Sequence, residues 1–317
     1  MDLKVVAFTG GVGGAKLADG LAQVLPPESL SVVVNTSDDF MHFGLKISPD
    51  LDTVLYTLAG ISNPDTGWGR IDETWQFMET IKQLGGPTWF NLGDRDLAIH
   101  AERTRRLESG ESLSAITADM CAALGVRVKV LPMTDYPVHT IVETRDGELE
   151  FQRYFVEFKA EPVVQRFRFV GSDNAEPAPG VTEAIKDADL VIFCPSNPWV
   201  SLDPILSIAG IQQALQEKAI LGVSPIIGGK AIKGPAAYMF EQAGIQPSAA
   251  AVAEHYQRQL RYFVIDRLDE DLQESIEAMG IEVLVTNTLM LNRHDRQRLA
   301  REIVDFVHNS TLKEGAP

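Results

Sequence analysis

The N-terminal segment holds the feature that most constrains the fold, an apolar run that breaks into a glycine-rich turn. The run is Leu3–Phe8, and the turn that follows, Thr9–Leu17, has four glycines within five consecutive positions. A helix over Ala15–Leu25 and a β-branched strand over Leu30–Val34 come next. This order predicts a βαβ unit, and hence a parallel sheet with a right-handed crossover. Glycines at the start of a helix let backbone N–H groups close on a phosphate, although a purely structural tight turn would use the same residues.

The same alternation of strands and helices returns in the C-terminal half of the chain. The predicted strands there are Leu190–Cys194, Ala219–Val223, Tyr262–Ile265 and Glu282–Val285. The predicted helices are Thr182–Asp187, Ile211–Glu217, Pro235–Ala243, Ala249–Gln257, Asp269–Met279 and Asp295–Val307. We therefore expect an α/β fold with a doubly wound, mainly parallel Rossmann-like sheet, built from residues 1–50 and 171–317. The tail from Asn309 to Pro317 has no apolar anchor and is expected to fray.

Residues 51–170 interrupt this alternation and are expected to form an inserted region. Helical periodicity covers Leu51–Leu58, Asp72–Leu84, Asp94–Glu108 and Leu113–Leu124. Strands are predicted at Arg127–Leu131 and Val163–Val170, with a hairpin of Thr140–Glu143 and Glu148–Tyr154 around an Asp-Gly turn. The insertion should thus be a helical block followed by a small β-rich part.

Composition narrows the class of function. A formal net charge of −16 over 317 residues argues against a nucleic-acid partner. No apolar run approaches the roughly 18–20 residues of a membrane span, and the N-terminus lacks the pattern of a signal peptide. Cys121 and Cys194 lie in apolar segments and are expected to be free thiols. We expect a cytoplasmic protein without a membrane partner, in which positive groups, N–H dipoles or metal ions gather wherever a phosphate binds.

Polar residues follow several strands at the points where they end. The carboxyl ends of parallel strands meet at one edge of a sheet, where open α/β folds bind ligands. The turn itself is neither a P-loop, which needs Gly-Lys-Ser/Thr, nor a full dinucleotide fingerprint, because the third glycine is missing. This disfavours a kinase or a dehydrogenase. The predicted nucleotide and phosphate contacts are Gly10, Gly11, Gly13, Gly14, Lys16, Asn35, Ser37, Asp38, Ser196 and Asn197.

Two acidic motifs have both a structural and a chemical interpretation. Asp50 and Asp52 lie at the start of a predicted helix, where carboxylates cap free N–H groups; they could equally hold Mg²⁺ or accept a proton from a hydroxyl nucleophile. The loop Asn91–Asp96 packs a glycine and an arginine among its aspartates, which favours a ligand loop over a simple helix cap. His100 alone is interpreted as a helix-face residue.

Taken in order, the motifs TGGVGGAKL, PDLDTVLY, WGRIDETW, WFNLGDRDLAIH, PSNP and SPIIGGKAIKGPAA resemble the 2-phospho-L-lactate transferase family, in its bacterial-type branch. The resemblance covers nearly the whole chain. It implies a transferase of coenzyme F-420 biosynthesis that is Mg²⁺-dependent. The ribityl hydroxyl of the deazaflavin Fo would attack a lactyl- or enolpyruvyl-diphosphoguanosine, and GMP would leave.

The resemblance also implies roles for individual residues. Asp52 and Asn91 match positions that contact Fo, and Asp94 and Arg95 lie in the same loop; Asp50 and Asp52 would place Mg²⁺ or orient the hydroxyl. The inserted region 51–170 would cover the acceptor, and a homodimer is expected from base rates. The alternative is a non-catalytic regulator that binds a nucleotide sugar, of the gluconeogenesis-factor type, which shares the glycine turn but not the LGDRD motif.

Overall fold

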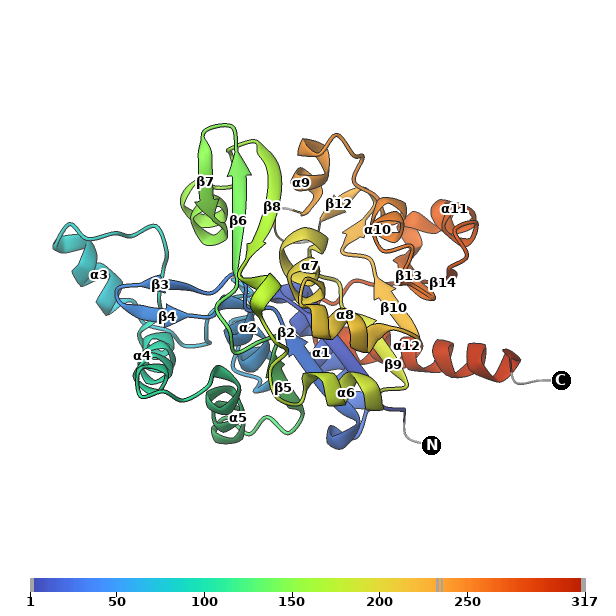
Figure 1. Cartoon of the computed structure of the whole chain (residues 1–317), viewed down its shortest axis with the longest axis horizontal. Helices are drawn as coiled ribbons and strands as arrows, with labels where there is room; N and C mark the ends of the chain where they lie inside the picture. The colour runs from blue at the N-terminus through green and yellow to red at the C-terminus, as the bar shows by residue number, and fades with distance from the viewer. Residues whose placement is uncertain (1–2, 232–233, 235, 315–317) are drawn as a thin grey trace.

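The chain is described by a computed structural model that covers residues 3–231, 234 and 236–314. Its centre is a seven-stranded sheet in the order β14-β13-β10-β9-β1-β2-β5, in which all neighbouring strands are parallel (Figure 1). The strands are β1 (Val5–Thr9), β2 (Leu30–Val34), β5 (Lys129–Pro132), β9 (Leu190–Phe193), β10 (Ile220–Val223), β13 (Tyr262–Asp266) and β14 (Glu282–Thr286). The predicted parallel sheet is confirmed.

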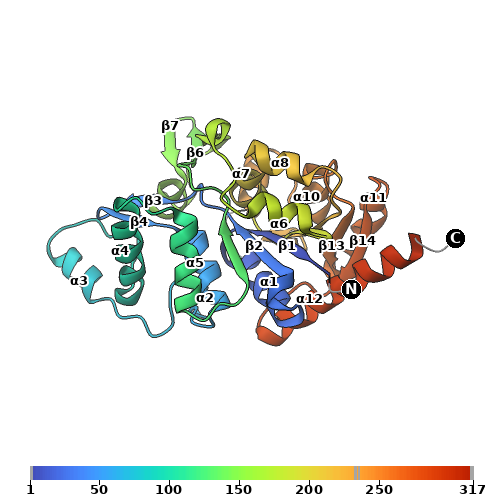
Figure 2. The ribbon, with the colours of Figure 1, turned by 60° about the horizontal axis from the view of Figure 1, so that its bottom comes forward.

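Helices cover both faces of this sheet, because side chains alternate along its buried strands. In β1, Val5 and Ala7 pack on one face, and Val6 and Phe8 pack on the other. The first face holds α1 (Gly11–Val24), α2 (Pro49–Leu58), α5 (Leu113–Ala123) and α12 (Arg293–Glu314). The second holds α6 (Val181–Asp187), α7 (Asp203–Leu206), α8 (Ala209–Leu215), α9 (Ala236–Gln242), α10 (Ala249–His255) and α11 (Gln273–Glu277). The sheet is therefore doubly wound, as predicted (Figure 2).

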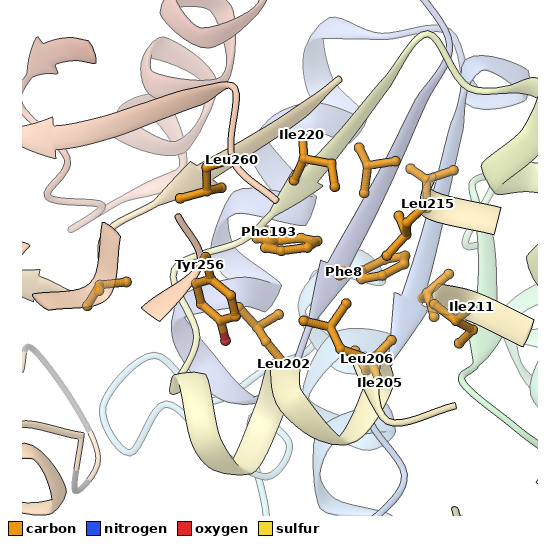
Figure 3. Packing of buried hydrophobic residues seen from close by; sticks show 14 of the residues in the cluster. Phe8, Phe193, Leu202, Ile205, Leu206, Ile211, Leu215, Ile220, Tyr256 and Leu260 are labelled. Carbon is orange, nitrogen blue, oxygen red and sulfur yellow. The ribbon is translucent and has the colours of Figure 1, made fainter. Parts of the chain in front are cut away.

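The core of the second face is built around the two central strands (Figure 3). Phe8 of β1 and Phe193 of β9 stack with ring centroids 5.7 Å apart, and Tyr256 meets Phe193 edge-on at 5.4 Å. Such aromatic pairs contribute about 0.5–1.5 kcal/mol beyond the area that they bury. This packing holds the ends of β1 and β9 in place, and with them the first residues of the loops that follow.

Smaller elements surround the sheet. A hairpin of β3 (Phe40–His42) and β4 (Leu45–Ile47) lies with α3 (Gln76–Gln83) and α4 (Asp94–Glu108) on the side away from the C-terminus (Figure 1). An antiparallel sheet of β7 (Gly147–Glu150), β6 (His139–Thr144) and β8 (Val164–Val170) stands above the central one. The remaining elements are β11 (Ile226–Ile227), β12 (Lys230–Ala231), the 3₁₀ helices η1 (Pro27–Ser29), η3 (Ser172–Asn174) and η5 (Arg267–Leu272), and the π-helices η2 (Arg153–Glu157) and η4 (Pro198–Leu202).

The structure corrects the predicted domain boundaries. The segment 51–170 is not one insertion, because β5 pairs with β2 at the edge of the central sheet and α2 and α5 pack on that sheet's first face. Within residues 51–170, the parts that lie outside the doubly wound core are α3, α4 and the β6–β8 sheet. The sequence RVKVL predicts a strand, but sequence order does not reveal which edge of which sheet that strand joins.

Three element predictions are also wrong in their extent. The helix predicted from Asp72 begins only at Gln76, and the strand predicted to Tyr154 ends at Glu150 and turns into helix. The tail does not fray at Asn309: α12 continues to Glu314, and Ser310 donates a hydrogen bond to Glu282 at 2.6 Å. The predicted helix start at Pro235 and the last three residues lie outside the described residues.

Candidate functional site

A cavity of about 490 Å³ opens at the carboxyl ends of the central strands. The chain leaves β1 toward β2 on one side and returns through β9 on the other, so the crevice lies at the point where the strand order reverses. The glycine turn after β1 and the loops after β9, β10 and β14 line the cavity. Aromatic residues between α2 and α4 and between β7 and β8 line it as well.

The glycine turn is the first turn of α1 itself, since the helix begins at Gly11 and not at Ala15. Gly10, Gly11, Gly13 and Lys16 line the cavity. Gly10 has no room for a side chain, because a Cβ there would lie 2.6 Å from Asp50 Oδ2, and a Cβ at Gly13 would overlap the carbonyl oxygen of Pro195. Gly10 and Gly13 are therefore required for packing. Because they have no side chains, their backbone atoms form part of the cavity wall. Gly14 is buried behind that wall.

The loop after β9 closes against this turn. Ser196 Oγ accepts a hydrogen bond from Gly10 N at 3.3 Å and lies 3.0 Å from Gly10 O, to which it donates. Asn197 caps η4 by accepting from Trp199 N at 3.1 Å. Both residues line the cavity, and their contact with a nucleotide stays a prediction. Lys16 also borders the cavity, where its Nζ donates to Met290 O at 3.0 Å in the loop after β14.

Asp50 reaches the glycine turn from the first turn of α2. Asn35 donates to Asp50 Oδ2 at 3.0 Å, and Asn35 is itself held by Ser37, whose N and Oγ donate to Asn35 Oδ1. Asn35 and Ser37 do not line the cavity, so their place is behind Asp50 rather than on a ligand. Burial raises the pKa of Asp50 to about 6, although the hydrogen bonds from Asn35 and from the Gly11 N–H oppose this rise.

Asp38 lies beside Asp50 on the cavity wall. Burial and the nearby charge of Asp50 raise the pKa of Asp38 well above its usual value. Among the residues that the structure describes, neither carboxylate forms an ion pair with a lysine or an arginine. Both carboxylates also accept hydrogen bonds, Asp50 from Asn35 and Gly11 N–H, and Asp38 from Ser37 and Thr140. Two buried, mutually repelling carboxylates match the hard ligand set that Mg²⁺ takes.

Asp52 has a different environment, because it belongs to a buried network on α2 and α4. Arg103 donates to both of its oxygens, one of them at 3.1 Å, and His100 Nδ1 lies 3.5 Å from Oδ2. His100 Nε2 lies 3.3 Å from Asp96 Oδ2, and Tyr56 donates to Asp96 Oδ1. All of these residues except Arg103 line the cavity. Asp52, Asp96 and His100 have the atoms to hold a metal ion, but the Arg103 charge beside them disfavours a cation there.

Aromatic residues also line the cavity. Trp68, Trp89 and Phe90 come from the segment between α2 and α4, and Phe151 and Phe155 come from the segment between β7 and β8. Phe151 belongs to a small apolar cluster with Val200 of η4, beside the loop after β9. Trp89 and Phe90 pack on Phe40 of β3, with centroids 5.7 and 4.9 Å apart, so the wall has its own small core. Asn91 also lines the cavity and is exposed, as a ligand contact requires.

Asp94 and Arg95 do not line the cavity, so the structure gives their predicted ligand contact no support. Asp94 instead caps α3, accepting from Gln76 N and Phe77 N at 3.0 Å each. Glu73 caps α4 in return, accepting from Arg95 N at 2.8 Å and Asp96 N at 2.9 Å. The LGDRD motif therefore works largely as a reciprocal cap between two helices, and the helix-cap interpretation holds for its first aspartate.

The sequence reasoning missed the network around Asp52. Tyr56 follows Asp52 by four residues, and His100 follows Asp96 by four, so helical spacing places each pair on one face. This spacing could have predicted the two pairs. The structure shows that His100 is a member of the site and not simply a helix-face residue. Arg103 and Asp52 are 51 residues apart in sequence, so local spacing could not predict that they pair.

Comparison with known proteins identifies relatives over nearly the whole chain. A curated phosphoenolpyruvate transferase from Streptomyces griseus is 42% identical over 96% of this chain and 98% of its own length. A 2-phospho-L-lactate transferase from Methanosarcina mazei is 37% identical over 95% and 99%. A crystal structure of a UPF0052 family member from Bacillus halodurans has a TM-score of 0.62 at 16% identity, covering 96% of this chain and 99% of that one, which shows the shared fold. The family model for 2-phospho-L-lactate transferase CofD matches residues 5–310, and the chain belongs to this family of transferases.

Proposed function

We propose that this protein transfers an enolpyruvyl phosphate group from a diphosphoguanosine donor to the ribityl hydroxyl of the deazaflavin Fo, in coenzyme F-420 biosynthesis in the cytoplasm. One observation supports this most: a single cavity is lined by the glycine turn, by Asp50 and Asp52, and by a set of aromatic side chains. The hydroxyl oxygen would bond to the phosphorus that bears the three-carbon acid. The bond from that phosphorus to the oxygen of GMP would break, GMP would leave with the bonding electrons, and Asp52 would take the proton of the hydroxyl.

The donor would lie at the glycine turn. The N–H groups at the start of α1, the helix dipole and Lys16 supply positive character where an acidic protein otherwise has little. Ser196 and Asn197 would approach the guanosine, and the loop after β14, which includes Thr288, borders the same space. In phosphoryl transfer such groups act by positioning and by neutralising charge, and no covalent nucleophile is needed.

Magnesium would be held by Asp38 and Asp50, which form no ion pair with a lysine or an arginine in the described part of the chain. When bound, the ion would supply positive charge to the diphosphate. The predicted metal contact of Asp52 is not part of this proposal, because Arg103 engages both of its oxygens.

The acceptor would place its flat ring among the aromatic side chains of the cavity, with Asn91 at the ring's edge and its ribityl chain running toward α2. Asp52 would accept the hydrogen bond of the terminal hydroxyl, which orients the oxygen toward the phosphorus. His100 and Asp96 lie beside this point and would contact the other hydroxyls of the chain.

The enolpyruvyl donor is favoured over the lactyl donor because relatives named phosphoenolpyruvate transferase reach 42% identity, and those named 2-phospho-L-lactate transferase reach 37%. The test is an assay with Fo and each donor, read by the mass of the product. Product from the enolpyruvyl donor and release of GMP are expected. Failure of Fo fluorescence to change on titration, together with binding of a UDP-sugar, would instead support the regulator alternative.

Asp52→Asn gives the residue-level test. Loss of a positioned proton acceptor should lower kcat by about 10²–10⁴-fold. Arg105→Ala, on an exposed ion pair of α4 with Glu102, is the matched control and should keep wild-type turnover. Wild-type turnover in Asp52→Asn would remove Asp52 from the chemistry.

A further inference from the structure

Arg103 is buried directly behind the cavity wall. Its side chain is 2% exposed, and it does not line the cavity itself. The guanidinium donates to both oxygens of Asp52, with Nη1 3.1 Å from Oδ2. Nη1 also lies 3.3 Å from His100 Nδ1 and 3.5 Å from the carbonyl oxygen of Lys46 in β4. One side chain thus joins α4, α2 and the β3–β4 hairpin at a single point.

Stability alone is a poor explanation for this pair. A buried ion pair loses the hydration of both charges, and apolar residues of similar volume often serve a core as well or better. The two-point contact does have a geometric effect, because the planar guanidinium fork fixes the plane of the carboxylate that it binds. A lysine at this position would hold a charge nearby without fixing that plane.

Asp52, whose carboxylate is fixed in this way, is one of the residues that line the cavity. An ionised carboxylate accepts about four hydrogen bonds, of which Arg103 takes two. Asp52 therefore keeps further acceptor positions, and it lines the cavity together with His100 and Tyr56. Asp52 is therefore presented to a ligand as an acceptor of fixed orientation.

We propose that Arg103 is a positioning residue for the transfer reaction, acting through Asp52 to hold that carboxylate toward the hydroxyl of the incoming alcohol. This inference rests on the proposed function, in which Asp52 accepts the hydrogen bond of the acceptor. Arg103 touches neither substrate, so its effect passes through one intermediate side chain. A purely structural brace between α2 and α4 is the competing explanation.

The two explanations differ in steady-state kinetics. If Arg103 positions Asp52, Arg103→Lys and Arg103→Ala should each lower kcat by about 10²-fold, the usual cost of a misplaced reacting group. The KM of the donor, which would bind at the glycine turn, should stay within about twofold of wild type. Guanidinium ion, added at millimolar concentration, should restore part of the turnover of Arg103→Ala. Arg105→Ala changes an exposed residue of the same helix, two positions after Arg103, and should behave as wild type.

A double-mutant cycle gives the sharpest result. In the Asp52→Asn background, Arg103→Lys should cause no further loss of kcat, and guanidinium should have no effect, because the group that Arg103 orients is gone. Losses that simply add would overturn the inference and favour a brace. Arg103→Lys keeps a buried cation, so the cycle with Arg103→Lys tests the inference even where Arg103→Ala does not fold. Circular dichroism and Fo fluorescence verify the folded state of each variant.

The cycle also separates the inference from the function beneath it. A large loss in Asp52→Asn with normal turnover in Arg103→Lys would overturn the inference alone. Normal turnover in Asp52→Asn would overturn both. Coupled losses, with partial rescue by guanidinium only when Asp52 is present, are the result that we expect.

Discussion

The fold buries the ionised carboxylate of Asp50, which lowers the stability of the protein at neutral pH. Asp50→Asn should therefore make the protein more stable while it removes activity. Burial raises the pKa of Asp50 from 3.8 to about 6. A shift of about two units corresponds to about 3 kcal/mol at neutral pH. Because the folded pKa is the higher one, the unfolded state binds fewer protons between about pH 4 and pH 6. Stability therefore falls as the pH rises through this window.

Asparagine removes the charge but not the whole interaction. Its oxygen can still accept from Asn35, whereas one of the two hydrogen bonds to the carboxylate, from Asn35 or from the Gly11 N–H, is lost at a cost of about 1 kcal/mol. The net gain at pH 7.5 should be about 1–2 kcal/mol, and it should shrink toward zero or below at pH 4. Urea unfolding in EDTA, followed by circular dichroism at both pH values, measures this difference.

Two comparisons make the test decisive. Asp266→Asn, which disturbs a buried carboxylate that accepts from the N–H groups of Leu268 and Thr288, should destabilise the protein. Added Mg²⁺ should raise the stability of the wild type and leave Asp50→Asn unchanged, since a bound ion removes the cost of the charge. An Asp50→Asn variant that is less stable than wild type at pH 7.5, or that keeps the wild-type pH slope, would refute the reasoning.

Three further predictions concern the walls of the cavity and the buried thiols. Trp89→Ala should weaken Fo binding by about tenfold in a fluorescence titration, whereas Arg95→Ala should bind Fo as wild type does, because Arg95 does not line the cavity. Gly13→Ala should lower the free energy of unfolding by about 1–3 kcal/mol in thermal denaturation, because its Cβ would overlap the Pro195 carbonyl; an unchanged midpoint would contradict that overlap. Cys121 should resist iodoacetamide in the native state, since burial raises its thiol pKa to about 12; rapid alkylation at neutral pH would contradict this.

The sheet could be predicted because its strands are buried on both faces and so appear as continuous apolar runs. The glycine turn and the polar loop after β9 then fall at carboxyl ends by topology alone, and the structure does place Gly10 and Ser196 in hydrogen-bonding contact. The position of β5 was not accessible in this way. An edge strand such as RVKVL carries the same pattern whether it belongs to an insertion or to the central sheet.

Side-chain partners were the harder part of the prediction. The sequence around Asp94 predicts a ligand contact, whereas the structure shows that Asp94 caps α3 by accepting from Gln76 N and Phe77 N. The predicted start of that helix, Asp72, lies four residues before the observed start, so the cap could not be predicted. Gly93 shows the same dependence, because a Cβ there would overlap the Glu73 side chain. Contacts between segments about 20 residues apart decide these roles, and no local pattern encodes them.

The first turn of α2 explains how two aspartates in one motif can do different work. Residues two apart on a helix point about 200° away from each other, so Asp50 and Asp52 face opposite sides of α2. Asp50 therefore meets the glycine turn and Asn35, and Asp52 meets Arg103 and His100. One carboxylate is left without a cation, as a metal ligand should be, and the other is fixed by a guanidinium, as a hydrogen-bond acceptor should be. The PDLD spacing thus gives two carboxylates on the wall of one cavity two different environments, which suit the separate roles that we propose for them.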